Sequence, residues 1–394
     1  MNGSLHAAFP GGTGERAPRT RGPRPPGAGR FATPWGGARP HLVDSRPGPP
    51  GERACPPRAG SLDCCAVTLE RLRNPNRIAP AARLGRAALL GVLLAAAVSL
   101  GATPNGTRPG TGALVVPPDA RVLVFAPHPD DETIGAGGLI FHLARRGVPV
   151  RVVFVTNGDG YAEAVAQDFH EQKPRDTDYV EFGEIRRREA IAAARHLGLH
   201  RGDLVFLGFP DGGLAQLWQD HWSRTRPYTS PYTKEDSPPT PDGAEYDGQD
   251  LASLVGRELR TFRPSVIVIP HPYDVHLDHA HTSYFVIDAL DALQAAHVLP
   301  ERVLVLTYLV HHPTWPSAGS DRDRLAPPSV KETPDTLWTG IDLTPAELAA
   351  KEAALGEYRT QLPVLGDLLH RFCRPNELYG RVKSRVLDGI AEVH

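Results

Sequence analysis

The sequence is short of cysteine and of net charge, and each shortage argues against a class of protein. Its four cysteines are Cys55, Cys64, Cys65 and Cys373, and none has the spacing of a zinc finger, which argues against a disulfide framework. A formal charge of −2 gives no electrostatic reason to expect a nucleic-acid partner. Proline and glycine, with 40 and 39 residues, are instead abundant and unevenly spread, so the chain divides into parts of different character.

Residues 1–66 form the first part, which is rich in Gly, Pro, Arg and Ala and shows neither a helical nor a strand period. Such a segment buries too little apolar surface to offset its conformational entropy, so we expect it to be disordered. Met1 is the only methionine, and an alternative start at Val67 would leave this segment untranslated. N-terminal sequencing of the purified protein distinguishes these two interpretations.

Residues 67–103 have the order of a secretory signal. Several arginines and no acid lie between Arg71 and Arg86, the apolar stretch 87–102 follows, and small residues lie near its end. The stretch is short for a membrane-spanning helix, which needs about 20 residues. The Pro/Gly-rich linker 104–118 argues against the alternative, a buried helix of the main domain. We therefore expect export, with the protein secreted or anchored on the outer face of the membrane through residues 87–102.

Residues 119–394 alternate short apolar runs with helical patterns. Continuous runs of Val, Ile and Leu are typical of strands that are buried on both faces of a parallel sheet. The predicted strands are 121–125, 150–156, 204–207, 266–269 and 303–310, and the predicted helices are 133–146, 181–197, 249–261, 282–296 and 344–361. We predict one α/β domain, a Rossmann-like three-layer fold with a mostly parallel sheet.

The segment 208–248 is irregular and too long for a simple connection in a compact domain. Segments of this length are usually lids or substrate-binding walls. Its aromatic side chains either stack against a bound sugar ring or pack the segment against the domain, and both alternatives stay open. These side chains are Trp218, Trp222, Tyr228 and Tyr232.

Two groups of His and Asp residues follow predicted strands, where open α/β sheets bind ligands. His128-Pro129-Asp130-Asp131-Glu132 comes directly after the first predicted strand, and His276-Leu277-Asp278-His279 comes shortly after the fourth. Adjacent carboxylates repel each other, so a bound cation is the simplest reason to place two of them there. Acids also suit the N-terminus of a helix, but that role requires no histidine.

The residue types and spacing indicate a zinc site. A catalytic zinc ion takes three His or carboxylate ligands and leaves a fourth position open. The candidate ligands are His128, Asp131 and His279. Asp130 would then be free to act as a general base. Asp278 could hydrogen-bond His276 and keep it protonated, so that His276 stabilises an oxyanion and protonates a leaving amine.

Together these motifs resemble the PIG-L/LmbE family of zinc-dependent N-deacetylases. The resemblance covers most of residues 121–394 and includes Thr156–Gly160, Arg186–Glu189, Leu207–Leu214, Tyr358–Gln361 and Asn376–Leu378. It implies an LmbE-like fold and removal of an N-acyl group, above all acetyl, from an amino sugar or sugar conjugate. It also implies zinc on His128, Asp131 and His279, Asp130 as the base, His276 as oxyanion and acid partner oriented by Asp278, and substrate binding by Arg186 and Asp211.

Two other functions remain open at this point. A metal-dependent phosphoesterase also uses His and Asp ligands, and such sites often hold two metal ions. A non-catalytic carbohydrate-binding module on the same fold is the second alternative, although such a module would not need the intact acids. No motif in the chain identifies the small-molecule partner or bears on the oligomeric state.

Overall fold

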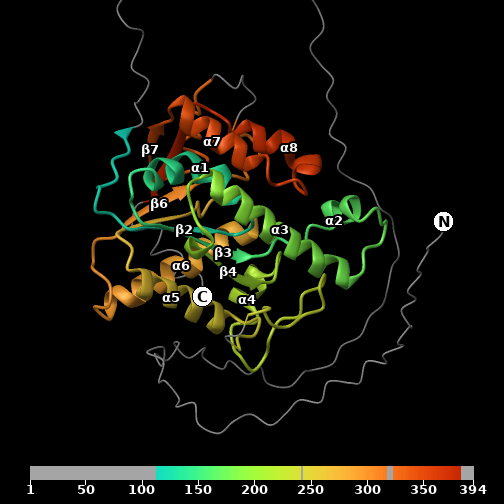
Figure 1. Ribbon diagram of the computed structural model, residues 1–394. Helices are drawn as coiled ribbons and strands as arrows, with labels where there is room; N and C mark the ends of the chain where they lie inside the picture. The colour runs from blue at the N-terminus through green and yellow to red at the C-terminus, as the bar shows by residue number, and fades with distance from the viewer. Residues whose placement is uncertain (1–111, 241–242, 317–322, 383–394) are drawn as a thin grey trace, which may run out of the picture. The chain divides into compact units, whose positions relative to one another are not determined.

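The computed structural model describes residues 112–240, 243–316 and 323–382. The predicted disordered segment 1–66, the predicted signal 67–103 and residues 104–111 of the predicted linker lie outside the described residues. Within the described ranges, no helix combines the length and the apolar character needed to cross a membrane. The described residues form an α/β domain with helices packed on a central sheet (Figure 1).

The sheet of the described residues has eight strands in the order β1-β7-β8-β6-β5-β2-β3-β4. The strands are β1 Gly112–Ala113, β2 Val122–Ala126, β3 Val150–Thr156, β4 Leu204–Phe209, β5 Val266–Pro270, β6 Leu304–Tyr308, β7 Thr336–Asp342 and β8 Asn376–Val382. The helices are α1 Asp131–Ala144, α2 Ala162–Asp168, α3 Asp176–His196, α4 Leu214–Gln219, α5 Gly248–Phe262, α6 Leu277–Ala295, α7 Pro345–Leu355 and α8 Leu362–Arg371, with one 3-10 turn at Arg201–Asp203.

Most neighbouring strands run parallel, and β8 alone among the described strands runs antiparallel to both of its neighbours. β2 lies at the centre, with β3 paired on one side and β5 on the other. The chain thus builds the sheet outward from β2 in one direction through β3 and β4, and later in the other through β5 and β6. This reversal is a topological switch point, where such sheets bind ligands.

The central strands form because both of their faces are buried. Alternate residues of β2 point to opposite faces: Val122 and Val124 pack in the layer of α1, α3 and α7, and Leu123 and Phe125 pack in the layer of α4, α5 and α6. In Figure 1 these two groups of helices lie on opposite sides of the sheet. The predicted three-layer, mostly parallel α/β fold is confirmed.

The structure differs from the predicted elements at the margins of the sheet. β1 lies inside the predicted linker 104–118 and pairs in parallel with β7. Neither β7 nor β8 was expected, and the predicted helix 344–361 ends at Leu355 and is followed by the separate helix α8. The predicted helix start is confirmed, because Thr344 and Glu347 form a capping box.

Helix α1 packs closely on the sheet and on the C-terminal part of the domain. A side chain at Gly135 would overlap the ring of Tyr308, so glycine allows this close approach. The carbonyl of Ile134 accepts a hydrogen bond from Lys351 Nζ at 2.8 Å, and the same Nζ lies 2.8 Å from Glu377 Oε1. The fully buried Lys351 of α7 and the buried Glu377 of β8 therefore form an ion pair against the middle of α1.

The segment 208–248 is packed against the domain by two of its tryptophans. The rings of Trp218 and Trp222 lie edge to face, 5.4 Å apart, and both contact Phe285 of α6. This observation favours the packing role that the sequence left open for these two residues. Tyr232 differs from them, because its side chain lines the pocket described below.

Candidate active site

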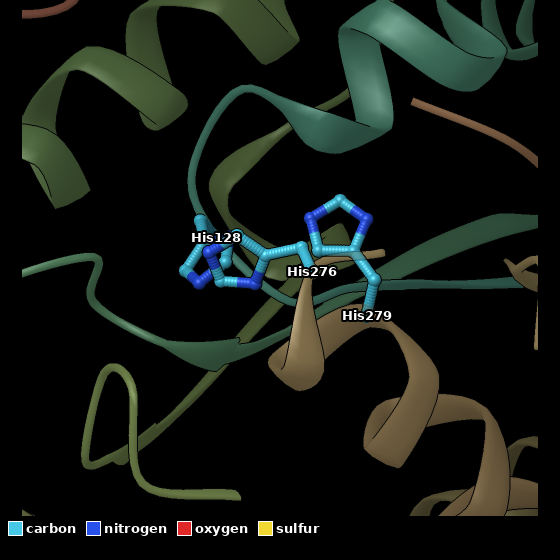
Figure 2. Close-up of side chains that lie close together, drawn as sticks. All are labelled: His128, His276 and His279. Atoms are coloured by element: carbon cyan, nitrogen blue, oxygen red, sulfur yellow. The ribbon is translucent and has the colours of Figure 1, made fainter. Parts of the chain in front are cut away.

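The two predicted motifs meet at the switch point. His128 lies in the turn after β2, and Asp131 is the first residue of α1. His276 caps the N-terminus of α6, and His279 lies in the first turn of that helix, after β5. Because β2 and β5 are adjacent parallel strands, their carboxyl ends bring the three histidines together, as Figure 2 shows.

Two histidine nitrogens converge on one carboxylate oxygen. Oδ2 of Asp131 lies 3.1 Å from His128 Nδ1 and 3.2 Å from His279 Nε2. His128 is 7 % exposed, Asp131 is 1 % exposed and His279 is 0 % exposed, so these three donors are shielded from solvent. Separations near 3.2 Å match the spacing of ligands around an ion bound at about 2.0–2.2 Å.

The second nitrogen of each of these two histidines faces a further carboxylate. His279 Nδ1 lies 3.1 Å from Asp274 Oδ2. His128 Nε2 lies 3.1 Å from Asp211 Oδ1 and 3.2 Å from Asp278 Oδ2. Burial lowers the pKa of both imidazoles, but neighbouring carboxylates outweigh it. Asp131 and Asp274 raise the pKa of His279 to about 10, and Asp211, Asp131 and Asp278 raise the pKa of His128 well above its ordinary value.

This arrangement fits a metal ion. Metal-binding histidines usually donate their other N–H to a carboxylate, which fixes the tautomer and the ring orientation. His279 Nε2 is buried and makes no hydrogen bond, although Asp131 Oδ2 lies nearby. A buried ring nitrogen left in this state is suited to coordinate a cation. His279 belongs to two groups of donors that could hold an ion, one with His128 and His276 and one with Asp131 and His311, and the predicted ligands His128 and Asp131 each belong to one of them.

Asp130 lies beside this set and is held by Arg186. The guanidinium Nη2 of Arg186 donates to Asp130 Oδ2 at 3.1 Å and to the carbonyl of Pro129 at 2.7 Å, and Nη1 donates to the carbonyl of Gly158 at 2.7 Å. Burial raises the pKa of Asp130, the charge of Arg186 opposes this rise, and the charge of Asp131 adds to it. A carboxyl group of raised pKa in a pocket is suited to general acid–base work.

The two predicted substrate-binding residues lie at the pocket, but their polar groups bind other groups of the protein. Arg186 and Asp211 both line the pocket. The three hydrogen bonds described for Arg186 go to Pro129, Asp130 and Gly158. Asp211 accepts a hydrogen bond from the N–H of Gly160 at 2.7 Å and faces His128. In this structure Arg186 therefore positions Asp130, and Asp211 orients His128.

Asp278 lies beside His128, which differs from the expected pairing with His276. Its carboxylate accepts hydrogen bonds from the N–H groups of Gly212 at 2.7 Å and Leu214 at 3.1 Å. His276 Nδ1 accepts from the backbone N–H of Asp278 at 3.3 Å, which leaves Nε2 to carry the ring hydrogen. Burial and the neighbouring His128 and His279 lower the pKa of His276 to about 4. The ring is therefore neutral here, whereas the sequence predicted a protonated ring.

Two residues at the site did not stand out in the sequence. Asp274 precedes the second motif, holds His279 and also accepts the backbone N–H groups of Val310 and His311 at 3.0 Å. His311 lines the pocket, with its ring 4.7 Å from that of His279 and 5.1 Å from that of His276. The sequence could have indicated His311 by its position, because it follows β6, the parallel neighbour of β5, at the same edge of the sheet.

The polar groups open into one pocket with a partly apolar wall. The pocket has a volume of about 340 Å³, and its polar lining residues include Asp130, His276 and His311. Its lining also includes Ile134, Tyr161, Tyr232, Leu365 and Leu368. A ligand of the size of a sugar would thus contact both polar and apolar side chains.

Comparison with known families agrees with this geometry. The family described as PIG-L, GlcNAc-PI de-N-acetylase, matches residues 123–290, which contain the ligand set and Asp130. Residues 123–290 are thus similar to the PIG-L family. The C-terminal elements β6 to β8 with α7 and α8 lie outside this match.

Curated relatives are about 30 % identical to this chain over the aligned segments. A 1D-myo-inositol 2-acetamido-2-deoxy-alpha-D-glucopyranoside deacetylase of Mycobacterium sp. (strain KMS) is 31 % identical over 177 residues, which are 44 % of this chain and 51 % of the relative. The chain therefore spans about half the length of this relative. The enzyme of the same name from Mycolicibacterium gilvum (strain PYR-GCK) is 28 % identical, over 63 % of this chain and 82 % of the relative.

Solved structures similar to this chain include proteins of two other organisms. A conserved protein of Thermus thermophilus gives a TM-score of 0.39 at 23 % identity, over 64 % of this chain and 84 % of that one. The N,N'-diacetylchitobiose deacetylase from Pyrococcus horikoshii gives a TM-score of 0.39 at 19 % identity, over 64 % and 75 % of the two chains.

Proposed function

We propose that this protein is a zinc-dependent hydrolase that removes an N-acetyl group from an amino sugar or sugar conjugate. The observation that carries the proposal is the convergence of His128 and His279 on Asp131 Oδ2, each with its second nitrogen on a carboxylate. The presence of this set inside the region that matches the PIG-L family, next to a buried carboxyl group in a pocket, supports amide hydrolysis.

His128 Nδ1, Asp131 Oδ2 and His279 Nε2 are the atoms that would hold the zinc ion. When bound, zinc supplies Lewis-acid polarisation of a carbonyl oxygen and lowers the pKa of a coordinated water to about 7. Asp274 and Asp278 keep the two ligand rings in orientation by accepting from their other nitrogens. The buried position of the set excludes bulk water, which strengthens its electrostatic interactions.

The remaining steps are made by residues of this chain. Asp130, which Arg186 holds at the pocket, accepts a proton from the water that attacks the amide carbon. His276 Nε2–H donates a hydrogen bond to the acyl oxygen as negative charge develops on it. The carbon–nitrogen bond then breaks, Asp130 returns its proton to the departing amine, and the products are a free amino sugar and acetate.

The names of the relatives support an N-acetylglucosaminyl substrate, since those proteins are deacetylases of an inositol glycoside that bears a 2-acetamido group. A phosphoesterase is less well supported. Among the described residues that line the pocket, Arg186 is the only arginine or lysine, and its two terminal nitrogens already donate to Asp130, Pro129 and Gly158. A phosphate group would therefore compete with these partners for this arginine.

The proposal is tested with the full-length protein, measuring metal content by elemental analysis and acetate release from N-acetylglucosaminyl substrates. We expect about one zinc per chain in the wild type, loss of zinc in His279→Ala, and retained zinc with turnover reduced at least about 100-fold in Asp130→Ala. Two metal ions per chain would favour the phosphoesterase. Zinc binding without any turnover would favour the carbohydrate-binding module, and full activity of Asp130→Ala would refute the mechanism.

A further inference from the structure

Asp130 has a backbone conformation that residues other than glycine rarely adopt. Its φ is 131° and its ψ is −31°, at the position that precedes the first turn of α1. Strained conformations of this kind persist only where the surroundings enforce them, and they concentrate at functional sites. The structure must therefore contain groups that hold the Asp130 backbone in place.

Each polar group of Asp130 has an identified partner. Its carbonyl accepts from the N–H groups of Thr133 at 3.0 Å and Ile134 at 2.9 Å, and its carboxylate accepts from Arg186. Its backbone N–H donates to Oε2 of Glu132 at 3.2 Å. The rotation of the Pro129–Asp130 peptide plane sets φ, and this plane is held by Glu132 at its N–H and by Arg186 at its carbonyl.

Glu132 is itself fixed by buried hydroxyl groups. Its Oε1 accepts hydrogen bonds from Thr133 Oγ1 at 2.6 Å and from the hydroxyl of Tyr358, which follows α7. Glu132, Thr133 and Tyr358 are 1 %, 0 % and 0 % exposed, respectively. A carboxylate with one oxygen anchored in this way has its other oxygen held in one place, under the N–H of Asp130.

We propose that Glu132 and Tyr358 are positioning residues that hold the strained backbone of Asp130 and thereby aim its carboxylate into the pocket. The inference rests on the proposed role of Asp130 as general base. The hydroxyl that binds Glu132 belongs to Tyr358, which lies 226 positions away in sequence and outside the family match. Loss of the Glu132 carboxylate would let Asp130 relax to an ordinary conformation, in which its carboxylate is displaced.

The competing explanation is that Glu132 only stabilises the N-terminus of α1. The chain offers a matched control for that role, because Tyr379 also donates its buried hydroxyl to a buried glutamate, Glu377, at 2.8 Å. Glu377 accepts from the N–H groups of Gly138 and Leu139, farther along α1. Tyr379→Phe therefore removes the same chemical group from a glutamate that also binds α1, without touching Asp130.

The experiment compares kcat, KM and zinc content in the full-length wild type and four variants. We expect Glu132→Met, which keeps the volume but removes the acceptor, to lower kcat roughly 10- to 100-fold with KM and zinc content unchanged. Glu132→Gln keeps one oxygen for the Asp130 N–H and should stay within about threefold of wild type. Tyr358→Phe should lower kcat about three- to tenfold, and Tyr379→Phe should leave kcat unchanged.

Two further measurements separate positioning from stability. In an Asp130→Ala background, Glu132→Met should cause no additional loss of the residual turnover, because the group that it positions is absent. A crystal structure of Glu132→Met should show Asp130 with a negative φ. This second measurement needs no activity.

The outcomes distinguish this inference from the proposed function. Absence of turnover in the wild type overturns the function, and a positive φ at Asp130 in Glu132→Met then overturns the inference separately. An active wild type with unchanged kcat in both Glu132→Met and Tyr358→Phe overturns the inference alone. Equal losses in Tyr358→Phe and Tyr379→Phe also overturn it, since general weakening of α1 would explain both. If Glu132→Met does not fold, Tyr358→Phe and its control decide the question.

Discussion

Lys351→Met should weaken the fold severely without touching the site. Lys351 is fully buried, and its Nζ donates to the carbonyl of Ile134 and pairs with Glu377, both at 2.8 Å. Methionine has a similar length and fits the space, so the change removes a charge and a donor without leaving a large cavity. The Glu377 carboxylate and the Ile134 carbonyl then lose a partner in a region that water does not reach.

The expected loss can be worked from these contacts. Removal of one partner from a buried ion pair costs about 3–5 kcal/mol, because the other charge stays buried and uncompensated. Glu377 keeps three donors, the N–H groups of Gly138 and Leu139 and the hydroxyl of Tyr379, which favours the lower half of that range. The unpartnered Ile134 carbonyl adds about 1 kcal/mol or more. We therefore expect Lys351→Met to lower the free energy of unfolding by about 4 kcal/mol.

Urea unfolding followed by tryptophan fluorescence measures this loss. Lys331, an exposed lysine, provides the control, and Lys331→Met should change the free energy of unfolding by less than about 0.5 kcal/mol. The double variant Lys351→Met/Glu377→Gln should regain at least about 1 kcal/mol over the single variant, because no buried charge remains. A loss below about 1 kcal/mol in Lys351→Met, or a double variant weaker than the single one, would show that the pair does not behave as a buried ion pair.

Two further predictions concern the site and its surroundings. Asp274→Asn should weaken zinc binding about 10- to 100-fold in a chelator competition while the fold is retained, because Asp274 orients His279; unchanged affinity would contradict that role. Burial lowers the pKa of His271 to about 4, so between pH 6.5 and pH 4 the unfolded chain binds more protons, and stability falls as the pH falls. This residue should account for about 2 kcal/mol of lost stability at pH 5, and His271→Asn should make urea midpoints measured from pH 7 to pH 4.5 correspondingly less pH-dependent.

The parallel half of the sheet was predictable because its strands are apolar along their whole length. β2 and β5 are buried at every position, and such runs allow few other interpretations. β8 could not be identified in this way, since its buried residues include Asn376 and Glu377, whose side chains are polar. Their burial depends on distant partners, as Glu377 shows with Gly138, and sequence periodicity carries no record of such contacts.

The site was predictable to the extent that it follows strand ends. His128, Asp131 and His279 come together because β2 and β5 are adjacent, and both motifs directly or shortly follow these strands. The direction of the Asp278 side chain was not predictable, because it is set by the backbone N–H groups of Gly212 and Leu214, and residue types do not reveal where backbone groups point. The same applies to Glu132, whose partner Tyr358 lies far along the chain.

The position of β8 also has a consequence for how the protein is made. β8 is the last of the described strands to leave the ribosome, yet in the finished sheet it lies between β6 and β7. During synthesis, β7 and β1 have no link to the rest of the described sheet until β8 emerges and pairs with β6 and β7. The same strand contains Glu377, which accepts a hydrogen bond from α1, the helix that begins with Asp131. The end of the domain that carries the candidate ligands therefore reaches its final support only after β8 has been synthesised.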